Sequence, residues 1–158
     1  MTEQEVTIRR AVRSDARELA GMRWDRAAED QPLDPDDRET FLDRQLTWFA
    51  EALENGWVAW VLEQDNRLCG QVFVNVVDTV PSPVPGPAGV GYVTNLWVAP
   101  GLRGQRRGAE LLEAAREWAV TVPLASLVVR PSAEATALFT GAGFRDGGML
   151  HLPLTPGA

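Results

Sequence analysis

Residues 96–112 read LWVAPGLRGQRRGAELL, and this stretch decides the fold. It predicts a strand over 91–99, a turn at 100–103 and an amphipathic helix over 105–120. Three arginines cluster where the turn meets the helix: Arg103, Arg106 and Arg107. Backbone N–H groups at a helix start favour an anion, and arginines add charge-assisted hydrogen bonds to phosphate oxygens. The stretch therefore predicts an anion site, with an ordinary solvated turn as the alternative.

The composition limits the chemistry that the chain can perform. Its 158 residues, 45% of them hydrophobic, suit one domain over residues 1–158 with one sizeable core. The 22 acidic side chains exceed the 15 basic ones, and the net charge of −7 argues against nucleic acid as a partner. Every basic residue is Arg, which excludes Lys nucleophiles and Schiff bases.

The sequence offers few residues for metals, disulfides or membranes. One Cys and one His exclude an intrachain disulfide and leave almost nothing for a zinc site or a Ser/His/Asp triad, so we expect no metal. No apolar run approaches the ~20 residues that cross a bilayer. We therefore expect a soluble cytoplasmic protein with no membrane partner.

Outward from the quoted stretch, hydrophobic periodicity predicts an α/β fold in the order β-α-α-β-β-β-α-β-α-β. Strands are expected over 6–10, 57–63, 68–77, 91–99 and 124–129, with terminal β structure from Phe144 onward and over 149–154. Helices are expected from Ser14 or Asp15 to residue 29 or 30, and over 38–54, 105–120 and 132–141. The prediction is a mixed sheet of six to seven strands with four helices, the last β region forming one or two strands.

The stretch Arg103–Gly108 resembles the signature of the GNAT superfamily of N-acetyltransferases, which use acetyl-CoA. That signature is Arg or Gln, two residues, Gly, one residue, then Gly or Ala, and the LWVAP before it is also family-like. Residues 132–144 resemble the family's second motif, Asn-x-x-Ala-x-x-x-Tyr-x-x-x-Gly-Phe. Arg106 replaces the middle Gly, where it either crowds the pyrophosphate loop or adds a phosphate contact. The resemblance implies a GNAT-like fold.

The resemblance also implies how acetyl-CoA would bind. The fourth strand would place main-chain groups against the pantetheine arm, and N–H groups at the helix start would hold the pyrophosphate. Ser132 stands where the family often has Asn, and Phe139 where many members have the Tyr that protonates the leaving thiolate. The expected cofactor-binding residues are Leu96, Trp97, Val98, Arg103, Gly104, Gln105, Arg106, Arg107, Gly108, Ala109, Ser132 and Phe139.

Catalytic groups are sparse on the fourth strand. Between residues 91 and 98 there is no carboxylate. Tyr92 and Asn95 are the candidates for orienting a water, although Tyr92 is equally interpretable as a packed strand aromatic. Because Tyr92 and Asn95 lie on opposite strand faces, a bulge would be required to aim both at one cleft.

The charge of one segment suggests which kind of acceptor the protein binds. Residues 29–43 hold seven acidic side chains and one Arg, and by resemblance this connection lines the acceptor side. An acidic rim would favour a cationic amine, whereas a solvated helix start with Asp caps is the alternative. Trp24 joins Glu29 and Asp30 as candidate substrate-binding residues, with a core position as its alternative.

The predicted function is acetyl transfer from acetyl-CoA to a primary amine by direct attack in a ternary complex. The acceptor is expected to be a cationic small molecule or peptide. The alternative is a CoA-binding sensor or interaction module with little or no turnover, suggested by Phe139 and the missing strand carboxylate. The expected partners are acetyl-CoA and the amine, and homodimer formation is left open.

Overall fold

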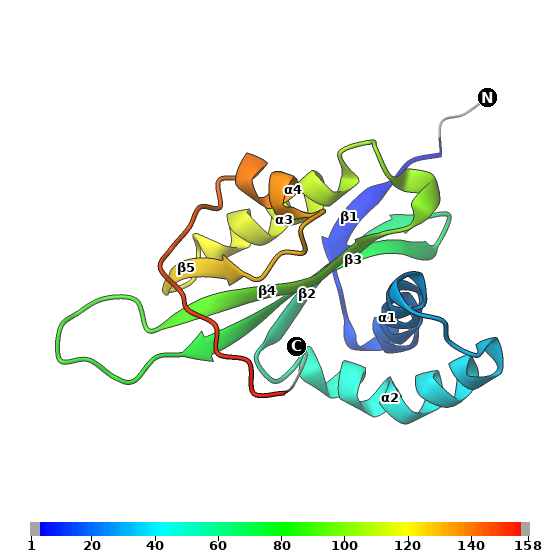
Figure 1. Ribbon diagram of the computed structural model, residues 1–158, viewed down its shortest axis with the longest axis horizontal. Coiled ribbons are helices and arrows are strands. Elements are labelled where there is room, and N and C mark those ends of the chain that lie inside the picture. Colours follow the sequence, from blue (N-terminus) through cyan, green and yellow to red (C-terminus); the bar gives the residue numbers. More distant parts are fainter. Residues whose placement is uncertain (1–3, 156–158) are drawn as a thin grey trace.

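Five strands form one sheet in the order β1-β2-β3-β4-β5, with helices on both faces (Figure 1). The computed structural model describes residues 4–155. The strands are β1 (Thr7–Arg10), β2 (Trp57–Gln64), β3 (Arg67–Asp78), β4 (Gly89–Val98) and β5 (Leu124–Val129). The helices are α1 (Ala16–Asp30), α2 (Arg38–Ala52), α3 (Arg107–Ala119) and α4 (Thr136–Gly141). Only β4 and β5 pair in parallel, and α3 is the crossover between them.

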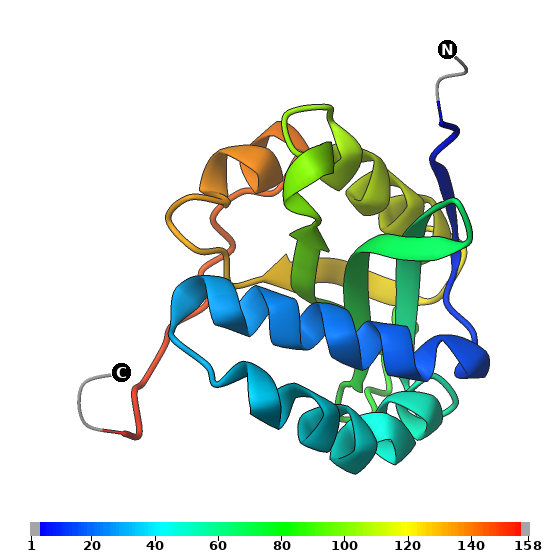
Figure 2. The same cartoon turned by 90° about the vertical axis from the view of Figure 1, so that its right-hand side faces the viewer.

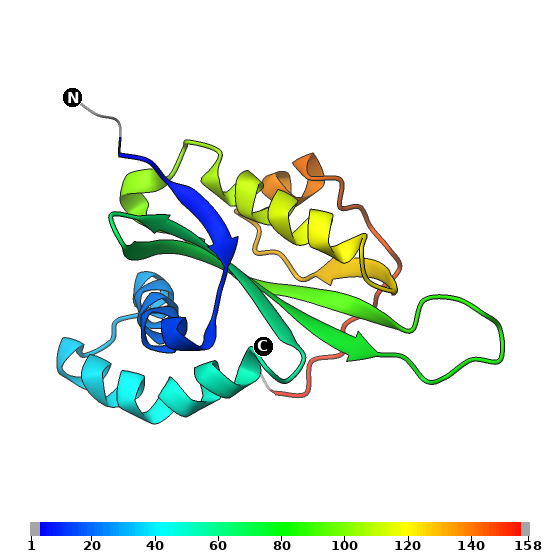
Figure 3. The same ribbon diagram turned by 180° about the vertical axis from the view of Figure 1, so that it is seen from behind.

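The sheet has a hydrophobic core on each face because successive buried side chains of its strands point to opposite faces. On β2, Val58, Trp60 and Leu62 join the cluster that contains α3 residues, whereas Ala59 and Val61 join the cluster under α1 and α2. Figures 1 and 3 show α1 and α2 on one side of the sheet and α3 and α4 on the other. The predicted α/β class, the four helices and the mixed sheet are confirmed.

The predicted terminal β structure is wrong for the described residues, so the sheet has five strands rather than six or seven. Residues 144–155 form neither helix nor strand. Gly147, Gly148 and Pro153 interrupt the segment, and Leu150 is 99% exposed. The alternation of apolar residues there does not produce a strand because the segment pairs with no neighbouring backbone.

The last helix is shorter than predicted. It begins at Thr136 rather than at Ser132, because residues 132–135 form a capping turn. The Ser132 hydroxyl and carbonyl both accept a hydrogen bond from the Ala135 N–H, at 3.2 and 3.1 Å. Ser132 is thereby held just after the end of β5.

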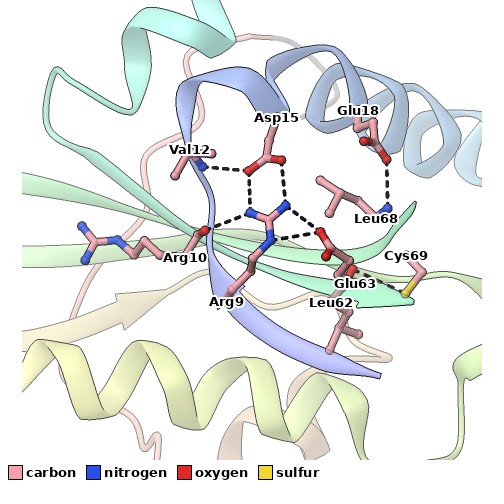
Figure 4. Close-up of polar contacts among 9 residues, drawn as sticks. All are labelled: Arg9, Arg10, Val12, Asp15, Glu18, Leu62, Glu63, Leu68 and Cys69. Carbon is pink, nitrogen blue, oxygen red and sulfur yellow. Dashed lines mark hydrogen bonds and ion pairs between the residues drawn. The ribbon is translucent and has the colours of Figure 1, made fainter. Parts of the chain in front are cut away.

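Arg9 anchors the start of α1 to the sheet through a buried carboxylate (Figure 4). Its guanidinium donates to both Asp15 oxygens at 2.8 and 2.9 Å and to Glu63 Oε2 at 2.7 Å. Asp15 also accepts from the Val12 N–H at 2.8 Å. The Arg9 hydrogen bonds hold the pKa of Asp15 below its usual value despite partial burial, so Asp15 is charged in the folded protein.

Replacing Asp15 with Asn should lower the free energy of unfolding at pH 7 by about 2 kcal/mol, because the Arg9 charge loses its main partner. A carboxylate whose pKa is depressed by folding stabilises above its unfolded pKa, and this stabilisation is lost as the pH falls through the folded value. The difference in free energy of unfolding between wild type and D15N should therefore have its full value above about pH 5 and decrease below about pH 4. Urea unfolding across this range measures it.

The exposed Asp146, in the segment after α4, provides the matched control. D146N should unfold like the wild type at every pH. A D15N penalty that persists unchanged at low pH would contradict the assignment of the stabilisation to the Asp15 charge.

Candidate functional site

The site lies where β4 and β5 separate. Their last residue pair is Val93 with Val129, yet β4 continues to Val98 while β5 ends. Figure 2 shows the C-terminal ends of the two strands pointing in different directions. The edge of β4 beyond Val93 is thus left without a β5 partner, and a cavity of about 420 Å³ is found at this point.

A bulge in β4 shapes this edge. Gln71 of β3 pairs with Trp97 and Phe73 pairs with Thr94, so Asn95 and Leu96 lie opposite the single residue between Gln71 and Phe73. Asn95 adopts φ of 58°, a left-handed conformation that Asn tolerates better than most residues. A bulge is present as the sequence analysis considered, and Asn95 and Leu96 of this bulge lie in the cavity lining, but Tyr92 does not.

The cavity walls come from both faces of the sheet. Contributors from α1, α2, β2 and β3 are Arg23, Arg26, Asp30, Trp48, Phe49, Trp57 and Phe73. Contributors from β4 onward are Val93, Thr94, Asn95, Leu96, Val129, Arg130, Pro131, Ser132, Ala135 and Phe139. Five residues that the sequence analysis named as site candidates line this cavity: Asp30, Asn95, Leu96, Ser132 and Phe139.

Tyr92 lies outside the cavity lining. It pairs with Asn75 and Val128 before the bulge and before the strands separate, and its side chain is partly exposed. The bulge begins too late along β4 to re-aim Tyr92. This placement does not support Tyr92 as a water-orienting group and leaves Asn95 as the candidate on this strand.

The start of α3 presents free backbone donors. The Glu110 N–H bonds back to the Arg106 carbonyl at 3.0 Å, so the N–H groups of residues 107–109 come before the first intrahelical bond. Arg106 has φ of 63°, in the left-handed region, which explains why the family signature has Gly there. The predicted helix start at residue 105 moves to Arg107 because this turn precedes it.

The three arginines of this loop have different surroundings. Arg103 donates to Glu29 at 2.6 Å and to the Val98 carbonyl at 2.9 Å. Arg107 pairs with Glu110 at 3.0 Å and is three-quarters buried. Within residues 4–155, Arg106 alone of the three has no carboxylate partner, and it is exposed.

Glu29 connects α1 to β4 instead of lining the cavity. Its Oε1 accepts from Trp97 Nε1 at 2.9 Å as well as from Arg103. Partial burial opposes ionisation, but these two hydrogen bonds hold the pKa of Glu29 below its usual value. The hydrogen bonds of Glu29 to Trp97 and Arg103 therefore connect the end of α1 to β4 and to the loop before α3, and Glu29 does not face the cavity. Trp24 also lies outside the lining and stacks at a tilt on Phe41, with ring centroids 5.5 Å apart.

The acidic segment does not form the predicted rim. Glu39 and Asp43 both pair with Arg17, and Arg38 pairs with Asp25 at 3.5 Å. Asp34 caps the turn that follows it by accepting from the Asp36 N–H at 3.0 Å. Of the residues 29–43, only Asp30 lines the cavity.

Sequence reasoning missed two cavity arginines on α1 and one after β5. Residues 16, 19, 23, 26 and 30 share one stripe of α1, because their spacing alternates between three and four. The first two are buried in the core, and the stripe then becomes charged with Arg23, Arg26 and Asp30. The sequence indicates this cavity wall by a helix stripe whose first residues are apolar and whose later residues are charged.

Phe139 is buried at the cavity and packs edge-on against Phe144, with ring centroids 5.3 Å apart. It has no ionisable proton, and the uncharged side chains near β4 in the lining that can donate a hydrogen bond include Thr94, Asn95 and Ser132.

Neither a metal-binding cluster nor a membrane-spanning helix is found among residues 4–155. No group of three or more His, Cys, Asp or Glu side chains among them could hold a metal ion. Between residues 4 and 155 no helix combines the length and the apolar character needed to cross a membrane.

Comparison with solved structures places the fold among acetyltransferases. A predicted acetyltransferase from Clostridium acetobutylicum, solved with acetyl-CoA, has TM-score 0.74 and 21% identity over 95% of this chain and 97% of that chain. An aminoglycoside N-acetyltransferase in complex with CoA has TM-score 0.73 and 15% identity over 98% and 97%. Glucosamine-6-phosphate N-acetyltransferase from Arabidopsis thaliana has TM-score 0.71 and 14% identity over 95% and 98%.

Sequence comparison gives the family. No curated protein sequence matches the chain significantly. The model of the "Acetyltransferase (GNAT) family" matches residues 18–144, which run from α1 to just beyond α4 and include every cavity residue. This protein therefore belongs to the GNAT acetyltransferase family.

Proposed function

We propose that this protein transfers the acetyl group of acetyl-CoA to a primary amine by direct attack. The observation that carries the proposal is the cavity at the separation of β4 and β5, bordered by an unpaired strand edge and reached from both sheet faces. Such a site admits a donor along β4 and an acceptor from the side of α1 and α2. Family membership and the neighbours solved with CoA or acetyl-CoA support it.

The donor's pyrophosphate would bind the free N–H groups of residues 107–109 at the start of α3. Arg106 is the exposed cation of that loop and would add a charge-assisted hydrogen bond to a phosphate oxygen. The pantetheine arm would lie along the free edge of β4 beyond Val93, with Ser132 on the opposite side. The acetyl carbonyl would then receive a hydrogen bond from the Leu96 or Trp97 N–H.

In the reaction, the neutral amine nitrogen attacks the thioester carbonyl carbon, an N–C bond forms and the C–S bond breaks. The nitrogen loses one proton, and the CoA sulfur gains one. Asp30, the carboxylate in the lining, would bind the ammonium form of the acceptor, and Asn95 would orient a water that takes the proton. Because Phe139 has no proton to give, the thiolate would be protonated by solvent.

Arg106 and Arg103 should respond differently to substitution. R106G keeps the left-handed turn without strain and removes the cation, so acetyl-CoA affinity should fall about threefold to tenfold with no loss of stability. R103A removes the bridge to Glu29 and should lower thermal stability more than R106G does. Isothermal titration with acetyl-CoA and thermal unfolding measure both variants.

Two comparisons sharpen this pair of variants. The E29Q/R103A double variant should have nearly the same thermal stability as R103A, because Glu29 and Arg103 form one contact that R103A already removes. An acetyl-CoA affinity that is unchanged in R106G would contradict the phosphate contact and leave Arg106 with a backbone role only.

Gly108 tests the donor site directly. A Cβ at Gly108 would meet Leu138 Cδ2 at 3.2 Å, a contact that is tight but adjustable. G108D should lose acetyl-CoA binding by at least about a hundredfold because it places a carboxylate at the proposed pyrophosphate site, whereas G108A should keep most of it. Isothermal titration distinguishes the two, and equal losses would point to packing rather than charge.

Turnover decides between the enzyme and the CoA-binding module. Thiol release with a panel of amines, and the mass of each product, should show sustained N-acetylation of at least one amine. Acetyl-CoA binding with no turnover across the panel would favour the module, and absence of binding at millimolar acetyl-CoA would refute both.

A further inference from the structure

We propose that the acceptor of this enzyme carries an anionic group, a carboxylate or a phosphate, bound by Arg23 and Arg26. The inference rests on the proposed acetyl transfer and names the class of its acceptor. It replaces the cationic acceptor suggested by residues 29–43, because the charges at the cavity differ from the charges of that segment.

The cavity is basic at its α1 wall. Arg23 and Arg26 line it from one stripe of α1, and Arg130 lines it from the end of β5, against the single carboxylate of Asp30. Arg26 and Asp30 are 3.9 Å apart at their nearest charged atoms, the limit of an ion pair. Within the described chain, Arg23 and Arg130 make no ion pair or side-chain hydrogen bond. The arginine charges of the cavity therefore exceed the carboxylate charge available to balance them.

These arginines are not needed for the phosphates of the donor. None of residues 103–109, where the pyrophosphate would bind, lines the cavity. Arg23 and Arg26 belong to α1, which covers the opposite face of the sheet from α3 (Figure 1). An anion at Arg23 and Arg26 would accordingly come from the acceptor.

Two other arginines at the contact between α1 and α2 are paired with carboxylates. Arg17, six residues before Arg23 and off the stripe, is paired with both Glu39 and Asp43 of α2. Arg38 of α2 is paired with Asp25 of α1. Carboxylates are thus available between the two helices, and none of them reaches Arg23.

The aromatic wall indicates the body of the acceptor. Trp48 is 48% exposed at the cavity, although its ring is 5.8 Å from that of Trp57 and 5.0 Å from that of Phe49. A tryptophan half exposed beside two packed aromatics offers apolar surface that an acceptor ring or chain would cover. Asp30 on the same stripe would hold the ammonium group. The site thus suits a small zwitterion with an apolar body, such as an aromatic amino acid.

Matched acceptor pairs that differ only in the anionic group test this class. The pairs are phenylalanine with phenethylamine and glucosamine 6-phosphate with glucosamine, and neamine represents polycationic acceptors. Thiol release should give a kcat/KM at least about tenfold higher for the anionic member of at least one pair. Which pair responds identifies carboxylate or phosphate as the source.

Variants locate the recognition. R23Q and R26Q should each lower kcat/KM for the preferred acceptor with an anionic group about tenfold, mainly through KM, and leave kcat/KM for its partner without that group within about twofold of the wild-type value. R44Q on α2 is the matched control, since Arg44 does not line the cavity, and it should change neither value. Acetyl-CoA affinity, measured by isothermal titration, should be the same in all three variants.

Each result has a defined meaning. Equal turnover of both members of each pair, preference for the members that lack the anionic group, or preference for neamine would overturn the inference while leaving acetyl transfer intact. If acetyl-CoA binds without turnover, titration of the same pairs into the CoA-loaded protein decides, and equal affinities would overturn the inference. Failure to bind acetyl-CoA would refute the proposed function, and the inference with it.

Discussion

The bulge at Asn95 and Leu96 is the constraint on which the rest of the structure depends. Up to Val93, β4 pairs with both β3 and β5. Pairing with β5 ends at Val93, and the two residues that then oppose one on β3 increase the local twist of β4 beyond that point. This separation leaves one edge of the β4 backbone without a strand partner inside the molecule. A bound donor could form hydrogen bonds to that edge without displacing another strand. The cavity, the start of α3 and the end of β5 all take their positions from it.

The cations around this opening are paired and unpaired arginines, since the sequence contains no Lys. The paired ones hold elements together: Arg9 fixes the start of α1, Arg17 joins α1 to α2, and Arg103 joins the loop before α3 to the end of α1. Arg103 therefore connects the proposed pyrophosphate loop to the helix that walls the acceptor side. Arg106 before α3 and Arg23 and Arg130 in the cavity lining make no ion pair within residues 4–155. This division follows from geometry, because a guanidinium already held by a carboxylate has little left for a ligand.

Much of the fold could be predicted from the sequence, because periodicity and turn residues are local signals. The strand over 124–129 and the start of the helix at Arg38 were predicted at their observed positions, and the GNAT resemblance placed the strand–turn–helix correctly. The terminal β structure failed because alternation specifies which face a residue would take, not whether a partner strand exists. The start of α4 was missed because Ser132 satisfies the backbone by a capping turn, which sequence alone does not distinguish from a first helical turn.

The acceptor side was harder to predict because charge along a sequence is not charge at a cavity. Residues 29–43 are acidic as a segment, but pairing and helix direction remove all except Asp30 from the lining. The wall comes instead from α1, where the stripe that begins with Ala16 and Leu19 in the core continues with Arg23 and Arg26. A helix stripe that faces a sheet is normally apolar throughout, since an unpaired charge buried there costs several kcal/mol. On this stripe Arg23 is exposed and lines the cavity together with Arg26 and Asp30, so its charge is not buried against the sheet. The charged end of α1 and the bulged part of β4 thus line one cavity, and together they define which acceptors that cavity can hold.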